Sequence, residues 1–348
     1  MNGESSAGAS TTPVLEVRNL SVKFVTDSGT VLAVNEACFH IDRGETVCLV
    51  GETGAGKSVA AFSVLQLLGA GGVSRRARQQ GDIILRPGDG REYHILSLPE
   101  HELERIRGRL ISMIYQEPMT SLNPVYTCGN QVAEVLMHHA RKSRREAMAA
   151  TEDLLKSVGI PDPRRVLKSY PHELSGGMKQ RVMIAMALAL HPVLLIADEP
   201  TTAIDVTIQA QILNLFKQIQ RSSGTSILFI THDVSVVAQL ADRVVVMYAG
   251  RTVETGSVRD VFCRPLHPYT KGLLKSIPKP FKVGEKPQHL IPIPGTIPNP
   301  ADLPSGCPFH PRCVWAQERC RACIPQVTTP DTGRAVMCWR WEELQGVS

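Results

Sequence analysis

Residues 51–58 read Gly51-Glu52-Thr53-Gly54-Ala55-Gly56-Lys57-Ser58, and this stretch decides the fold of the 348-residue chain. It matches the phosphate-loop pattern G-x-x-x-x-G-K-[ST] in full. The run from Thr46 to Val50 before it is apolar enough for a buried strand, and Ser58 to Leu68 after it has the spacing of a helix. A strand, a glycine-rich loop and a helix in this order predict an α/β core that binds the phosphates of a nucleotide.

The residue types in this loop predict how it would hold the nucleotide. Glycines let backbone N–H groups close around the β-phosphate, and the following helix adds the positive end of its dipole. Lys57 would bridge the β- and γ-phosphates, and the hydroxyl of Ser58 would bind Mg²⁺. We therefore expect every residue from Gly51 to Ser58 to contact a nucleotide.

A second apolar run ends in two carboxylates, Asp198 and Glu199, after Leu194-Leu195-Ile196-Ala197. Ligands of parallel sheets bind at the carboxyl ends of the strands, so these side chains would face the phosphate loop. We expect Asp198 to hold Mg²⁺, and Glu199 to be the catalytic residue that polarises the attacking water.

Composition excludes several classes of protein. The chain is 43% hydrophobic and 20% charged, which is too apolar for a disordered chain. Its longest apolar stretch, Val182 to Ala197, is interrupted by His191 and Pro192 and falls short of the ~20 apolar residues of a membrane span. The polar N-terminus, Met1 to Pro13, does not resemble a signal peptide, so we expect a cytosolic protein. The net charge of +5 is mild, and nucleic acid is not expected as a partner.

The order of apolar patterns predicts how the chain is divided. Short strand-like runs alternate with helices, except between about residues 117 and 190, where the pattern is helical throughout. Eight prolines between Ile277 and Pro304 disfavour both helix and central strand. We expect a domain over 1–265 with a helical subdomain at about 117–190, and an irregular Cys- and Pro-rich extension over 266–348.

The motif Leu174-Ser175-Gly176-Gly177-Met178-Lys179-Gln180 opens a long apolar helix and forms a second anion cradle. Here the sequence resembles the ATP-binding cassette (ABC) family, whose signature motif is L-S-G-G-Q or a close variant; Met178 replaces the usual Gln. The resemblance implies a P-loop NTPase core of the ABC nucleotide-binding type with an antiparallel β subdomain. It also implies that Ser175, Gly176 and Gly177 contact a nucleotide held by another ATPase subunit.

Further family markers follow in order, and their roles are those that the resemblance implies. Gln116 resembles the Q-loop glutamine, which touches Mg²⁺ and nucleotide. Ala203-Ile204-Asp205 resembles the D-loop, with Asp205 near the nucleotide and Ile204 where Leu is usual. His232 resembles the switch histidine of the catalytic site, and Phe24 stands where the family places a ring against adenine.

Longer stretches are similar to the ATPases of bacterial oligopeptide and dipeptide importers. These stretches are Gln116–Pro124, Ala197–Thr207, the tetrapeptide His267-Pro268-Tyr269-Thr270, and Gly306–Cys313. The resemblance implies a peripheral protein on the cytoplasmic face of the inner membrane. Its partners would be a second, homologous ATPase subunit in a heterodimer, two membrane permeases and an extracytoplasmic substrate-binding protein.

Two alternatives to peptide import stay open at this point. The same machine could carry nickel, glutathione or another small solute, because cargo is selected by other subunits. A soluble ABC ATPase acting on ribosomes or DNA is the alternative from another class. The single cassette and the mild charge favour the transporter.

Five of the nine cysteines crowd the last 42 positions, and in a cytosolic chain such a cluster indicates metal binding more than disulfides. The spacing Cys307-x5-Cys313-x6-Cys320-x17-Cys338 offers four thiolates. Soft sulfur ligands suit an iron–sulfur cluster or zinc, with free buried thiols as the remaining alternative. A similar tail in peptide-importer ATPases is associated with a 4Fe–4S cluster, which the resemblance therefore implies here. Cys323 is an alternative to Cys320 as the third ligand.

Overall fold

The computed structural model describes residues 12–27, 29–68, 76–116, 121–202, 204–277 and 292–346. Its centre is a seven-stranded sheet in the order β11-β10-β9-β3-β8-β7-β6. The five strands from β9 to β6 are parallel, whereas β10 and β11 pair antiparallel at one edge. The strand bounds are β3 Thr46–Val50, β6 Ile111–Ile114, β7 Leu194–Asp198, β8 Ser226–Thr231, β9 Arg243–Tyr248, β10 Arg251–Ser257 and β11 Ala335–Val336.

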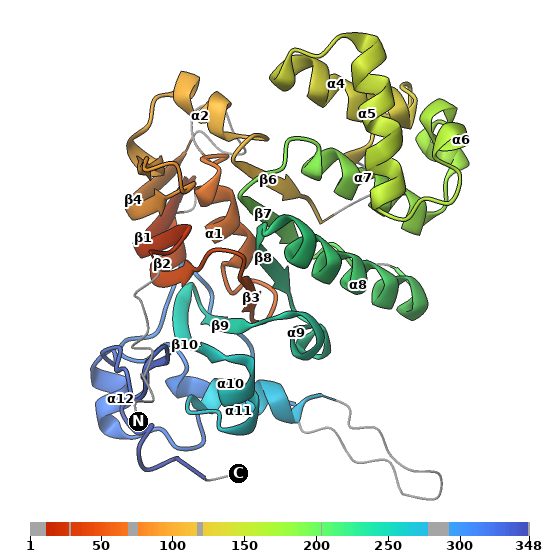
Figure 1. Cartoon of the computed structure of the whole chain (residues 1–348). Coiled ribbons are helices and arrows are strands. Elements are labelled where there is room, and N and C mark those ends of the chain that lie inside the picture. The colour runs from red at the N-terminus through yellow and green to blue at the C-terminus, as the bar shows by residue number, and fades with distance from the viewer. Residues whose placement is uncertain are drawn as a thin grey trace, which may run out of the picture.

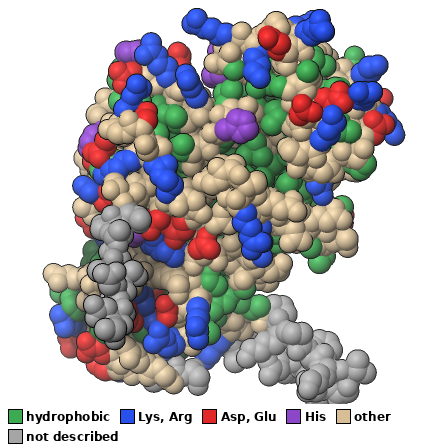
Figure 2. Space-filling view, in the orientation of Figure 1, with side chains coloured by type: hydrophobic (Ala, Val, Ile, Leu, Met, Phe, Trp, Pro, Cys, Tyr) green, Lys and Arg blue, Asp and Glu red, His purple; other side chains and the backbone are tan. Residues whose placement is uncertain are grey.

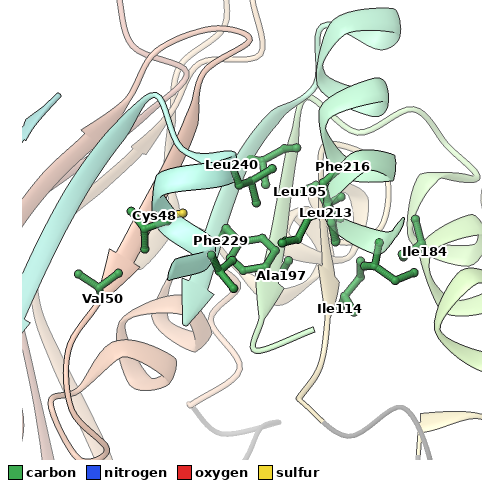
Figure 3. Packing of buried hydrophobic residues seen from close by; sticks show 14 of the residues in the cluster. Cys48, Val50, Ile114, Ile184, Leu195, Ala197, Leu213, Phe216, Phe229 and Leu240 are labelled. Atoms are coloured by element: carbon green, nitrogen blue, oxygen red, sulfur yellow. The ribbon is translucent and has the colours of Figure 1, made fainter. Parts of the chain in front are cut away.

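The parallel strands are buried on both faces because their side chains alternate between two apolar clusters. In β3, Cys48 and Val50 belong to one cluster, and Val47 and Leu49 belong to the other. Figure 3 shows the first cluster, in which Phe229 of β8 lies between the sheet and the ring of Phe216. Burial on both faces explains why these strands appear in the sequence as continuous apolar runs.

A separate four-stranded antiparallel sheet in the order β2-β1-β4-β5 confirms the expected β subdomain. It begins with a long hairpin of β1 (Leu15–Thr26) and β2 (Gly29–Ile41), to which β4 (Ala77–Leu85) and β5 (Tyr93–His94) add. One face of this sheet packs in the same cluster as Val47 and Leu49 of β3. The β subdomain therefore lies directly beside the strand that leads into the phosphate loop (Figure 1).

The helical insertion is the lobe at the upper right of Figure 1. It contains α4 (Cys128–Ala140), α5 (Arg144–Ser157), α6 (Pro163–Lys168) and α7 (Gly176–Leu188). Side chains cap the start of each helix, including a capping box between Ser143 and Glu146 at α5. Residues 117–120, where the insertion was expected to begin, lie outside the described residues.

The remaining helices flank the sheets and the extension. They are α1 Lys57–Val64, α2 Glu100–Ile106, α8 Val206–Ser223, α9 Val234–Leu240, α10 Val258–Cys263, α11 Pro268–Lys275 and α12 Glu318–Ala322, with short 3₁₀ turns at Ile95–Ser97, Pro171–Glu173 and His310–Arg312. The 18-residue α8 has no counterpart among the predicted elements. Its signals are an N-cap at Asp205, apolar residues at helical spacing and a C-cap at Gly224.

The C-terminal extension packs against the core instead of standing apart. β11 adds to the edge of the central sheet, and Cys307, Phe309 and Met337 belong to the larger apolar cluster. Most of the described extension is irregular, as the proline content predicts, although Pro278, Pro280 and Pro287 lie outside the described residues. In the part of the chain that the structure describes, no helix is long and apolar enough to cross a membrane.

Candidate nucleotide site

The phosphate loop connects β3 to α1, as the sequence predicts. Gly56 has φ +96°, in the left-handed region. A Cβ at this position would stand 2.4 Å from the carbonyl oxygen of Ala33 in the neighbouring hairpin. Glycine at 56 is therefore required twice, by backbone conformation and by the close approach of β2. Ala55 is fully buried, while Thr53 and Gly54 are exposed at the tip of the loop.

Lys57 is folded back over the loop that precedes it. Its ammonium donates to the carbonyl oxygens of Gly51 at 2.8 Å and Glu52 at 3.0 Å. Burial lowers the pKa of Lys57, and the nearby carboxylates of Glu199 and Asp198 oppose that shift. The ammonium is thus held within the loop, where a phosphate would replace carbonyl oxygens as its partner.

Ser58 and Asp198 meet across the site. The Ser58 hydroxyl donates to Oδ1 of Asp198 at 3.1 Å. Burial raises the pKa of Asp198, which the hydrogen bond from Ser58 opposes. A hydroxyl and a carboxylate oxygen on the first turn of α1 and the end of β7 are the hard oxygen donors that Mg²⁺ prefers. The donor set at this edge of the sheet fits the expected ion.

Glu199 is the centre of a polar group contributed by three segments. Gln116 donates from Nε2 to one carboxylate oxygen at 3.1 Å, and Thr202 donates to the same oxygen at 3.0 Å. His232 lies 3.0 Å from the other oxygen. Glu199 itself has φ +45°, an unfavourable conformation for this residue type, which is typical of functional sites.

The pKa of Glu199 is lowered. Burial raises it, but the hydrogen bond and charge of His232, the hydroxyl of Thr202 and the charge of Lys57 outweigh burial. The carboxylate is therefore ionised at neutral pH and is able to accept a proton. Its side chain is only 12% exposed, whereas that of His232 is 53% exposed.

Phe24 lies on β1, where it pairs in register with Val31 of β2 and Ala77 of β4. Its ring is partly buried against the apolar cluster of the β subdomain. The residue is thus on the element that the sequence indicates.

The signature residues stand at the start of α7. The Ser175 hydroxyl accepts from the backbone N–H of Met178 at 3.4 Å, as a helix N-cap does. A Cβ on Gly177 would lie 2.7 Å from Cγ2 of Ile208 on α8, whereas Gly176 has open space around it. Asp205 caps α8 by accepting from the N–H of Ile208 at 3.0 Å.

Within the described ranges, no hydrogen bond or ion pair joins Ser175, Gly176, Gly177 or Asp205 to the phosphate loop. The structure brings together the phosphate loop, Gln116, Asp198, Glu199 and His232, and it leaves the signature cradle as a separate surface. Ala203, next to Asp205, lies outside the described residues.

Four cysteines of the extension line one pocket: Cys307, Cys313, Cys320 and Cys338. Cys323 is exposed and is not among the residues that line this pocket. In the described segments, however, no three His, Cys, Asp or Glu side chains form a group that could hold a metal ion. The ligand arrangement expected from the spacing is therefore not formed in this structure.

Sequence analysis missed two residues that contact the phosphate loop from the extension. The Tyr269 hydroxyl accepts from the backbone N–H of Glu52, and the Arg312 guanidinium donates to the carboxylate of Glu52. Both residues stand in stretches that carry the family resemblance, His267–Thr270 and Gly306–Cys313. Their contacts depend on tertiary structure, because 217 and 260 positions separate them from Glu52.

Known proteins are similar in sequence to this chain over nearly its whole length. The family model described as ABC transporter matches residues 34–202, and the one described as oligopeptide/dipeptide transporter, C-terminal region, matches residues 253–320. The second match runs from β10 into the extension and includes Tyr269 and Arg312.

Among curated proteins, the chain is 50% identical to the oligopeptide transport ATP-binding protein OppD of Escherichia coli K12 over 328 residues, covering 94% of this chain and 93% of that protein. It is 48% identical to the oligopeptide transport ATP-binding protein AppD of Bacillus subtilis over 330 residues, covering 95% and 97%. Among solved structures, it is similar to the dimeric ATP-binding cassette MJ0796 in a post-hydrolysis state with ADP and Pi. That similarity has a TM-score of 0.60 and 25% identity, covering 70% of this chain and 99% of that one.

Proposed function

This chain belongs to the ABC transporter ATP-binding family, an ATPase family, and from that premise we propose that its ATP hydrolysis drives the import of peptides. The observation that carries the proposal is the match of two regions at once. The cassette is common to many ABC transporters, whereas residues 253–320, from β10 into the extension, match a region described for oligopeptide and dipeptide transporters. About half of all residues are identical to OppD and AppD along both regions.

The roles proposed for the site residues follow from their contacts. ATP would lie along Gly51–Ser58 with Phe24 beside the base, and Mg²⁺ would be held by Ser58, Asp198 and Gln116. Glu199, ionised and held by His232, accepts the proton of the attacking water. The imidazole of His232 is 53% exposed, so it would be available to contact the γ-phosphate.

A single chain supplies only half of each complete site. In the described chain, no hydrogen bond or ion pair joins Ser175, Gly176 or Gly177 to the phosphate loop. We propose that this signature cradle closes over the nucleotide of a second ATPase subunit, with Asp205 at that interface. The similarity to a dimeric cassette supports this arrangement. A homologous but different subunit is the partner we propose, as in a heterodimer.

The other proposed partners are two membrane permeases and an extracytoplasmic binding protein, with this chain peripheral on the cytoplasmic face of the inner membrane. The proposed contact with the permeases is the segment Gln116–Pro124 and its neighbours. Val125 and Tyr126 are 69% and 56% exposed at this place, so adjacent apolar side chains are available to a partner. Residues 117–120 of this segment are outside the described ranges.

Charge argues against the rival that acts on ribosomes or DNA. Figure 2 shows Lys and Arg interspersed with Asp and Glu over the visible face, without one continuous basic surface. Proteins that bind along a phosphate backbone gather positive charge along one face.

For the division of the chain, we propose residues 1–265 as the ATPase domain and residues 266–348 as the extension.

Transport by the reconstituted complex tests the proposal. The chain would be assembled with its permeases and binding protein in liposomes, and uptake of labelled peptides would be measured with ATP inside. ATP-dependent peptide uptake that stops in the E199Q variant is expected. Uptake of nickel or glutathione without uptake of any peptide would identify a different cargo. Recovery of the chain from cells with ribosomes and without a permease would refute a role in transport.

We also propose that the cysteine pocket holds a 4Fe–4S cluster through Cys307, Cys313, Cys320 and Cys338. The supporting observations are that these four thiols line one pocket and that Cys323 points elsewhere. When bound, the cluster would act as a staple for a segment rich in turns.

Anaerobic purification tests the cluster. Brown protein with about four irons and four sulfides per chain is the result expected for a 4Fe–4S centre. C338S should lose iron, whereas the matched variant C323S should keep it. Colourless protein with stoichiometric zinc would show that the cysteines bind zinc instead of a cluster. Protein without any metal would show that the four cysteines are free buried thiols.

A further inference from the structure

Glu52, the second residue of the phosphate loop, is held by the C-terminal extension through a bidentate ion pair. Nη1 of Arg312 donates to one oxygen of the Glu52 carboxylate at 2.9 Å, and Nη2 donates to the other at 3.2 Å. The Arg312 side chain is 5% exposed and that of Glu52 is 29% exposed. A fork-to-fork pair of this kind fixes orientation as well as charge.

Arg312 is itself held in place on its other sides. Its Nε donates to the carbonyl oxygen of Pro294 at 2.8 Å, and Nη2 also reaches the carbonyl of Ile293. The guanidinium lies 5.7 Å from the centre of the Tyr248 ring, at the end of β9. The arginine is therefore preorganised by the extension and does not depend on Glu52 for its position.

A second contact fixes the backbone of the same loop residue. The N–H of Glu52 donates to the Tyr269 hydroxyl at 2.9 Å. Tyr269 is fully buried on α11, and its ring packs against Tyr248 and Phe309. Side chain and main chain of one phosphate-loop residue are thus both held by segments that follow the cassette.

We infer that Arg312 and Tyr269 are positioning residues of the nucleotide site, through which the C-terminal extension sets the charge and the path of the phosphate loop. An unpaired carboxylate in this loop would repel the phosphates of ATP. Arg312 neutralises that charge, and Tyr269 fixes the direction of the Glu52 peptide. Neither residue contacts the reacting atoms, so both act through Glu52.

The same contacts connect the nucleotide site to the cysteine pocket. Arg312 directly precedes Cys313, and Phe309, which packs on Tyr269, lines the pocket. A rearrangement of the pocket would therefore displace the two groups that hold Glu52. This connection uses residues of this chain alone and is independent of the cargo that the transporter carries.

A double-mutant cycle on nucleotide affinity tests the inference. The Kd of the full chain for a fluorescent ATP analogue with Mg²⁺ would be measured for the wild type, R312A, E52Q and the double variant. R312A should weaken binding about tenfold, which corresponds to ~1.4 kcal/mol. R312A/E52Q should recover most of that loss, because the carboxylate left unpaired by R312A is then absent.

R321A is the matched control, since Arg321 is also in the extension but is exposed and does not line the cysteine pocket. Its Kd should equal that of the wild type. Y269F keeps the buried ring and removes only the acceptor for Glu52, so it should weaken binding even if R312A does not fold. The inference is overturned by wild-type affinity in R312A or Y269F, or by a loss in R312A that E52Q does not relieve.

Discussion

Nδ1 of His232, just after β8, lies 3.0 Å from Oε1 of Glu199, just after β7. The neighbouring parallel strands β7 and β8 bring the two side chains to the same edge of the sheet. The pair leaves the second oxygen of Glu199 to Gln116 and Thr202. The three side chains bonded to the carboxylate favour its ionised form, which is the form that accepts a proton.

Replacing Glu199 with Gln should abolish turnover while leaving ATP binding intact. Gln still accepts and donates hydrogen bonds at this place but does not take a proton from water, so we expect kcat to fall by about 10²–10⁴. The rate of phosphate release and the Kd for ATP would be measured side by side on the assembled complex. The control is the same change at Glu45, which directly precedes β3 and so lies at the end of this strand away from the phosphate loop. E45Q should leave kcat unaltered. Wild-type turnover in E199Q would show that Glu199 is not the general base.

The pH dependence of hydrolysis should shift when His232 is replaced. The pKa of Glu199 is lowered in part by the hydrogen bond and charge of His232. In H232A that pKa rises, so protonation of Glu199 sets in at higher pH and the acid limb of the kcat profile moves upward. H101A, at an exposed histidine of α2, should leave the limb in place. An unchanged acid limb in H232A would separate His232 from the ionisation of Glu199.

Gly177 should tolerate no side chain while Ile208 is present. A Cβ would stand 2.7 Å from Cγ2 of Ile208, and such overpacking costs about 1–3 kcal/mol of unfolding free energy. G177A should therefore lower the midpoint of denaturation, and I208A in the same chain should restore it. The ATPase rate of the double variant separates the two roles of this glycine. Recovered stability with lost hydrolysis indicates that Gly177 also approaches nucleotide, and recovery of both assigns it to helix packing alone.

Acid should destabilise the chain through His267. Burial lowers the pKa of His267 to about 3, against an ordinary value of 6.5. Above pH 6.5 the imidazole is neutral in both folded and unfolded chains. As the pH falls below 6.5 the unfolded chain binds a proton that the folded chain excludes, so stability declines by about 2 kcal/mol between pH 6.5 and 5.

H267N should reduce this acid sensitivity. Nδ1 of His267 accepts from the N–H of Tyr269 as the N-cap of α11, and Asn is able to replace it as a cap without titrating. Urea denaturation at pH 5 and 7 would be compared for both chains. H101N, at an exposed position, should retain the full decline. An equal decline in H267N would locate the acid sensitivity elsewhere.

The purified chain alone should be a poor ATPase whose specific activity rises with concentration. In the described part of one chain, no hydrogen bond or ion pair joins the phosphate loop to the signature cradle, and in the proposed function a second subunit completes the site. Rates would be measured over a wide range of dilution, with and without the partner subunit and permeases. Full activity that is independent of concentration in a monomer would contradict the two-chain site.

Contacts that are local in sequence were predictable from it. The phosphate loop has its glycines, Lys57 and Ser58 within eight positions, and the strand before it is a continuous apolar run because both faces of β3 are buried. The carboxylates Asp198 and Glu199 are likewise adjacent at a strand end. Each of these motifs depends on short-range geometry, so its residue types and spacing carry enough information to predict it.

Only the tertiary structure showed which residues remote in sequence contact the phosphate loop. The pairing of Glu52 with Arg312 joins positions 260 apart, and neither residue type predicts a partner at such a distance. The packing of Gly177 on Ile208 depends in the same way on how α7 and α8 are placed. Charge pairing and close packing are properties of position in space, and the chain acquires them only when the sheet brings remote segments together.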